Sequence, residues 1–138
     1  MKTIIAILYA HLVKRRNKKW IDSPLKWQTN TFKKLIKNGV KTEFGKNHDF
    51  ENIQSYEQYK EKVPVRDYEE LRPYIEKVVN GEKDILWPGK PLYFAKTSGT
   101  TSGAKYIPIT KESIKTHIRS ARDALLNYFL KTKNFKPL

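Results

Sequence analysis

Residues 96–110 read KTSGTTSGAKYIPIT, and this stretch decides how the rest of the chain is interpreted. Positions 97–103 hold only Thr, Ser and Gly, and a lysine and a β-favouring run follow them closely. Leu92–Ala95 before the loop and Tyr106–Ile109 after it have the composition of short strands. The pattern predicts a strand, a polar loop and a second strand, joined as a hairpin over residues 92–110.

The loop has three properties that suit a polyphosphate ligand. Glycine lets the backbone approach a ligand closely, successive N–H groups form an anion-binding concavity, and hydroxyls and a lysine add donors. The sequence therefore predicts phosphate binding by one group of residues: Ser98, Gly99, Thr100, Thr101, Ser102, Gly103 and Lys105. A connecting turn or linker is the alternative, because Thr/Ser/Gly clusters are common in both. Neither the Walker pattern nor GxGxxG is present.

The segments before the hairpin have mainly helical periodicity. Helices are predicted over 3–17, from Pro24 to Gly39, and from Ser55 to just before Pro64. The segment 42–50, TEFGKNHDF, is predicted as a loop because Gly, Asn and Asp cluster there. The expected buried stripe of the second helix consists of Trp27, Thr31, Phe32, Leu35 and Ile36.

Two further helices complete the predicted elements. Asp67 is expected to cap a helix in which Pro73 causes a kink or a break. Thr110 is expected to cap a last helix over 111–131, whose buried stripe is Ile114, Ile118, Ala121, Leu125 and Phe129. The predicted fold class is α/β, with helices over 1–80 followed by the start of a mixed sheet.

Composition restricts the function classes. The 138 residues suit one domain, there is no cysteine, and three scattered histidines show no ligand spacing, so no metal site is predicted. The net charge is +14, and residues 1–41 hold eleven Lys/Arg against the single acid Asp22. Such a charge suits nucleic acid, an acidic surface or an anionic substrate. The apolar run 4–13 is too short to span a bilayer, and a cytoplasmic protein is expected.

At the loop the sequence resembles the adenylate-forming enzymes, and its flanks resemble the GH3 acyl acid–amido synthetases and their bacterial relatives. The resemblance covers about residues 41–115. The matching segments are TEFGK, VPVRDYEELRPYIEKVVNGE, ILWPGKP and FAKTSGTTSGAKYIPIT.

The resemblance implies ATP-dependent activation of a carboxylic acid, with Mg²⁺, followed by transfer of the acyl group to an amino acid. Ser98, Thr100 and Thr101 would then donate hydroxyls to the phosphates, and Lys105 would supply charge. The helix after the hairpin would line the acyl pocket, where Arg122 is a candidate for the substrate carboxylate; an exposed basic residue is the alternative interpretation. No catalytic residue is predicted.

Members of that family are several times longer than 138 residues. We therefore expect residues 1–138 to be a partial N-terminal, ATP-binding domain that is inactive without a C-terminal part. The expected partners are small-molecule acids and amino acids, with no nucleic acid and no membrane. Two alternatives remain open: a basic nucleic-acid-binding module, and a non-catalytic remnant that acts only through protein contacts.

Overall fold

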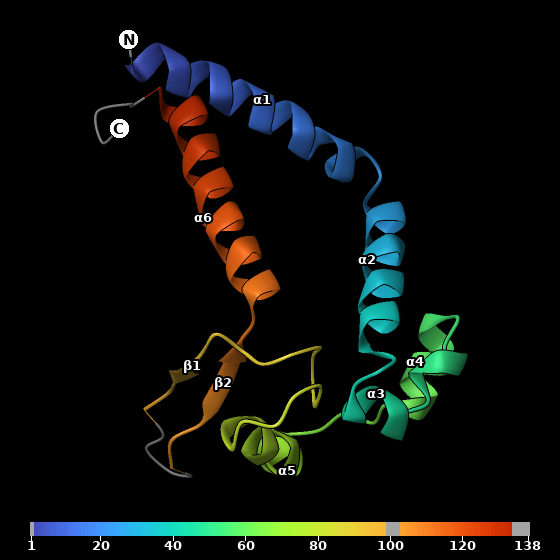
Figure 1. Cartoon of the computed structure of the whole chain (residues 1–138). Helices are drawn as coiled ribbons and strands as arrows, with labels where there is room; N and C mark the ends of the chain where they lie inside the picture. The colour runs from blue at the N-terminus through green and yellow to red at the C-terminus, as the bar shows by residue number, and fades with distance from the viewer. Residues whose placement is uncertain (1, 99–102, 134–138) are drawn as a thin grey trace. The chain divides into compact units, whose positions relative to one another are not determined.

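The computed structural model describes residues 2–98 and 103–133, with helices, a two-stranded hairpin and turns (Figure 1). The chain divides into two compact units, residues 1–28 with 112–138, and residues 29–111. No helix in the described part of the chain is both long and apolar enough to cross a membrane. The mixed content of helices and strands agrees with the predicted α/β class.

The first unit contains α1 (Lys2–Asp22) and most of α6 (Lys111–Thr132). Ala10, Val13 and Leu126 form its buried cluster, and Leu130 packs against them. The helix α1 continues beyond the predicted end at residue 17, because Lys and Arg favour helix. The predicted stripe on α6 is only partly correct: Phe129 is buried, whereas Leu125 is half exposed and Leu126 takes its place.

The helix α2 (Pro24–Gly39) begins at the predicted proline. Its buried face differs from the prediction, because Trp27 and Leu35 are about half exposed, at 48% and 50%. Ile36 is buried instead, in a cluster with Phe50 and Ile53. This packing rotates the buried face toward the residues that follow the helix.

The segment 42–50 was predicted as a loop, and this prediction is wrong. It forms α3 (Glu43–Asn47), followed by the 3₁₀ helix η1 (Phe50–Asn52). Thr42 caps α3: its hydroxyl oxygen accepts from the Gly45 N–H at 2.9 Å and donates to the Gly39 carbonyl at 2.7 Å. The helix α4 (Tyr56–Lys62) follows with Ser55 as its predicted cap, and Tyr59 packs against the Ile36 cluster.

A kink or a break was predicted at Pro73, and the helix α5 (Tyr68–Val79) runs through this residue without a break. Its start is fixed by a capping box in which Asp67 and Glu70 exchange side-chain and backbone hydrogen bonds, both 2.9 Å long. Proline removes one backbone hydrogen bond, and the remaining bonds and the packing of Ile75 and Val78 keep the helix continuous.

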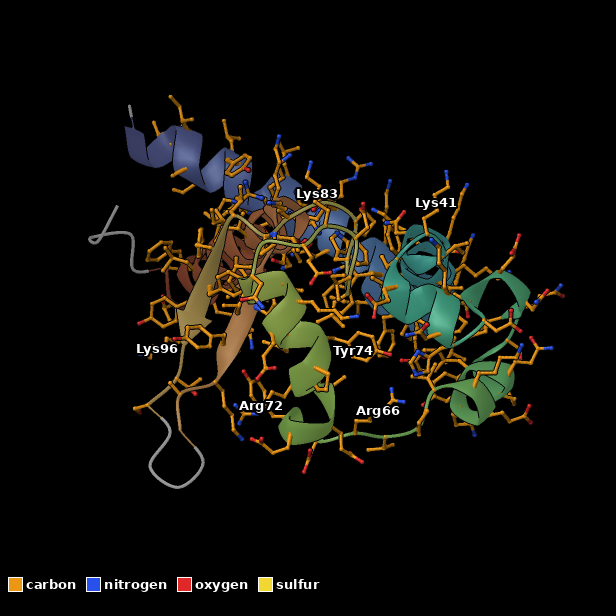
Figure 2. All side chains as sticks on the ribbon, turned by 60° about the horizontal axis from the view of Figure 1, so that its bottom comes forward. Lys41, Arg66, Arg72, Tyr74, Lys83 and Lys96 are labelled. Atoms are coloured by element: carbon orange, nitrogen blue, oxygen red, sulfur yellow. The ribbon has the colours of Figure 1, made fainter. Side chains whose placement is uncertain are left out.

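The strands β1 (Tyr93–Lys96) and β2 (Tyr106–Ile109) form the predicted antiparallel hairpin, with Ala95 opposite Ile107. The helix α5 lies against β2 and also contacts α3. In Figure 2, Tyr74 projects from α5 toward α3, whereas Arg72 lies on the side of the hairpin. The Tyr74 hydroxyl accepts from the Asn47 amide at 3.0 Å.

Candidate functional site

The Ser/Thr/Gly loop connects the two strands of the hairpin. Its base is closed by the Thr97 N–H, which donates to the Lys105 carbonyl at 3.1 Å. Of the predicted phosphate-binding residues, the structure describes Ser98, Gly103 and Lys105; the other four, residues 99–102, lie outside the described residues. Ser98 is exposed at the end of the first arm, and Lys105 is half-buried at the start of the second.

Gly103 shows why the Ser/Thr/Gly loop ends in a glycine. Its φ is +80°, a left-handed conformation that side chains rarely adopt. A β-carbon at this position would meet no heavy atom within 4 Å. The requirement for glycine at this position is therefore conformational.

Lys105 follows the loop two positions after Gly103. No carboxylate lies within ion-pair distance of it among the described residues. Its ammonium group lies 5.2 Å from the centre of the Tyr68 ring. The Tyr68 hydroxyl in turn accepts from the Tyr106 N–H at 2.8 Å. A half-buried lysine with an aromatic neighbour, and without a counter-ion in the part of the chain that the structure describes, is suited to an anionic ligand.

Sequence reasoning missed Tyr68 as part of this site. The signal that points to it is the spacing of Asp67 and Glu70, which places Tyr68 as the first residue of a capped helix. Nothing in the local sequence shows that this helix meets the hairpin.

A shallow cleft of about 250 Å³ lies between α5 and the start of β2. Tyr68, Arg72 and Glu76 line it from α5, and Ala104 and Tyr106 line it from the hairpin. Arg72 is engaged within the helix by two hydrogen bonds to Glu69, of 2.7 and 2.8 Å, which raise the pKa of its guanidinium. The cleft therefore combines an already paired cation with an aromatic wall.

The residues present fit an anion better than a metal cage. Among the residues that the structure describes, no three His, Asp or Glu side chains gather in a way that could hold a metal ion. Mg²⁺ with few protein ligands is usually carried by substrate phosphates, so the predicted Mg²⁺ would arrive with a nucleotide.

Arg122 belongs to the other compact unit and lies on α6. Its guanidinium donates to the Asp123 carboxylate at 3.1 and 3.3 Å and lies 5.5 Å from the centre of the Tyr9 ring. Burial alone would raise the pKa of Asp123, but hydrogen bonds from Arg16, Arg122 and Asn17 lower the pKa below its usual value. The acyl-binding role of Arg122 stays a prediction.

The family model described as "GH3 family N-terminal domain" matches residues 14–137. The chain belongs to the GH3 family. The match includes the capped α5, the hairpin and α6, so the resemblance predicted from the loop and its flanks is confirmed.

Curated GH3 relatives are similar over part of this chain. "Probable indole-3-acetic acid-amido synthetase GH3.13" of Oryza sativa subsp. japonica is 37% identical over 76 residues, which are 52% of this chain and 16% of that protein. "Jasmonoyl--L-amino acid synthetase GH3.5" of the same plant is 29% identical over 97 residues, 69% of this chain and 17% of that protein. "Indole-3-acetic acid-amido synthetase GH3.15" of Arabidopsis thaliana is 40% identical over 62 residues, 44% of this chain and 10% of that protein. The matched stretch thus spans about a sixth or less of each relative.

Proposed function

We propose that this GH3 chain supplies the first phosphate-binding segment of an ATP-dependent acyl acid–amido synthetase. The observation that supports the proposal is the hairpin itself: a Ser/Thr/Gly loop between two paired strands, followed by a lysine with no carboxylate partner among the described residues. The family match across the whole hairpin supports the same interpretation.

The proposed reaction has two steps. A carboxylate oxygen of the acid attacks the α-phosphorus of ATP, the bond to the β-phosphate oxygen breaks, and pyrophosphate leaves. The amino group of an amino acid then attacks the acyl carbonyl carbon, the acyl–phosphate bond breaks, AMP leaves, and the amine loses a proton. In the first step, negative charge develops on pyrophosphate as it leaves. Fixed hydrogen-bond donors and cations near the phosphates therefore favour that step.

Each loop residue has a proposed part in binding the nucleotide. Ser98, Thr100 and Thr101 would donate hydroxyl hydrogen bonds, and the loop backbone, including that of Ser102, would present N–H groups. Gly99 and Gly103 would allow the backbone to approach the phosphates, and Lys105 would act as a point charge. Mg²⁺ bound to the phosphates would neutralise part of their charge.

The substrates are proposed only as classes. The names of the relatives specify different acyl groups: one is an indole-3-acetic acid-amido synthetase, and the other a jasmonoyl–L-amino acid synthetase. We infer a small carboxylic acid and an amino acid for this protein, and a C-terminal part of the enzyme as a requirement for turnover. A cytoplasmic location belongs to the same proposal.

The loop assignment can be tested by titrating the ¹⁵N-labelled chain with Mg-ATP. We expect shifts concentrated on the amides of residues 97–106. Binding should be at least about 10-fold weaker after Lys105→Met, because a charge-assisted hydrogen bond contributes about 1.5–3 kcal/mol. The matched control is Lys83→Met, which removes the same charge from an exposed turn of the same unit. ATP–pyrophosphate exchange is expected to be absent from residues 1–138 alone.

Two outcomes would contradict the proposal. If Lys83→Met weakens binding as much as Lys105→Met, the nucleotide is attracted by general positive charge. The second outcome is tight RNA or DNA binding with a steep salt dependence, which would favour the nucleic-acid alternative.

A further inference from the structure

Tyr68 contacts the hairpin at two successive residues. Its hydroxyl accepts from the Tyr106 N–H at 2.8 Å, and its ring lies 5.2 Å from the Lys105 ammonium nitrogen. The first contact restrains the backbone of Tyr106, and the second restrains the side chain of Lys105. A single residue of α5 therefore restrains both the position and the direction of Lys105.

Tyr68 is itself held in place by the start of α5. The capping box of Asp67 and Glu70 fixes the first turn of the helix, in which Tyr68 is the first residue. At the other end of the same helix, Lys77 pairs with Glu43 of α3 at 2.7 Å. The hydroxyl of Tyr68 is thus presented to the hairpin by a helix that is anchored at both ends.

The two cations near the Tyr68 ring differ in their availability. Arg72 lies 5.6 Å from the ring centre and is neutralised by its two hydrogen bonds to Glu69. Lys105 has no such carboxylate within the described ranges. The aromatic ring therefore lies beside a charge at Lys105 that no carboxylate of the described residues neutralises, where an anion would bind.

We propose that Tyr68 is a positioning residue that holds Lys105 in place for the polyphosphate of the nucleotide. This inference rests on the proposed function of the loop. A free lysine loses considerable side-chain freedom when it binds a ligand. A ring that already restricts the ammonium, together with a fixed Tyr106 backbone, reduces that loss on binding.

The test measures binding of Mg²⁺-pyrophosphate to the whole chain by calorimetry. Tyr68→Phe keeps the ring and removes the hydroxyl, so we expect about 5-fold weaker binding from the loss of one hydrogen bond. Tyr68→Leu removes the ring as well, and about 10- to 30-fold is expected. Tyr74→Phe is the matched control, because the Tyr74 hydroxyl accepts a hydrogen bond from Asn47 on the other side of α5. No change in the affinity for pyrophosphate is expected for this variant.

A second readout does not need a ligand. Hydrogen exchange of the Tyr106 amide should be about 5-fold faster in both Tyr68 variants than in the wild type and in Tyr74→Phe. Unchanged exchange in Tyr68→Phe would overturn the proposed restraint of the backbone, whatever the loop binds.

A double-mutant cycle separates positioning from general support of the fold. If Tyr68 acts through Lys105, Tyr68→Leu should lose much of its effect on pyrophosphate affinity in a Lys105→Met background. Fully additive effects would overturn the inference. If the wild type binds pyrophosphate and both Tyr68 variants bind it equally well, only this inference fails; if the wild type does not bind, the proposed function of the loop fails with it.

Discussion

Gly45 packs so closely against Gly39 that a β-carbon on Gly45 would lie 2.0 Å from the Gly39 carbonyl oxygen. The obstacle is backbone, so it cannot move aside as a flexible side chain does. Gly39 is similarly confined, because a β-carbon there would lie 2.8 Å from the Phe50 ring. The end of α2 and the short helix α3 are thus joined through two glycines.

Gly45→Ala is expected to destabilise the chain by a few kcal/mol, because the clash forces the backbones of α2 and α3 apart. The measurement is the free energy of unfolding from urea titration. Lys46→Ala, an exposed neighbour on the same helix, is the control, with an expected change within about 0.5 kcal/mol. Equal stability of Gly45→Ala and wild type would show that the two helices are not packed as described.

The hydroxyl of Thr42 is the second link between the same helices. Thr42 is 1% exposed, and its oxygen both donates to Gly39 and accepts from Gly45. Thr42→Val keeps the shape and removes both bonds, so we expect a loss of about 1–2 kcal/mol in the free energy of unfolding. Thr42→Ser keeps the hydroxyl and should retain most of the stability. The prediction fails if Ser and Val are equally destabilising.

The hydrogen bonds of His48 predict the tautomer that carries its proton on Nδ1. The Arg66 guanidinium can only donate, and its nitrogen lies 2.7 Å from His48 Nε2, so Nε2 must accept. Nδ1 lies 2.7 Å from the Phe44 carbonyl and must donate. Long-range ¹H–¹⁵N spectra at neutral pH should show an unprotonated Nε2. In Arg66→Gln this preference should weaken, whereas a protonated Nε2 in the wild type would contradict the described contact.

The stability of the chain should depend on the ionisation of Asp123. The pKa of Asp123 is lowered in the folded state. The ionised carboxylate therefore contributes to the free energy of unfolding above the unfolded pKa of about 3.9, and this contribution is lost as the pH falls through the folded pKa. In urea titrations from pH 6 to pH 2.5, the free energy of unfolding should decrease less for Asp123→Asn than for the wild type. Arg16→Gln, which removes one partner of Asp123, should move the wild-type decrease to higher pH.

The elements that the sequence predicted correctly are those with local signals. The hairpin was placed within one residue at β1, because a polar loop between two β-favouring runs is a local pattern. Pro24 and Ser55 mark the starts of α2 and α4 for the same reason.

The missed features depend on contacts between distant residues. The five-residue helix α3 has little propensity of its own, and its first N–H groups donate to the carbonyls of Asp84 and Ile85, about 40 positions away. The buried face of α2 turns toward Phe50 and Ile53, which follow the helix in sequence. Tyr68 is 38 residues from Tyr106, so its place at the candidate site could not be predicted from local sequence.

The edge of β2 that faces away from β1 limits where a further strand can join the sheet. Backbone N–H groups of a strand point alternately to its two sides, so those of residues 106 and 108 share the side away from β1. The Tyr106 donor is taken by the Tyr68 hydroxyl, and Pro108 has no N–H to offer. This edge therefore resists pairing with another chain, as protected edges do. We expect any further strand, from the same protein or a neighbour, to add along β1.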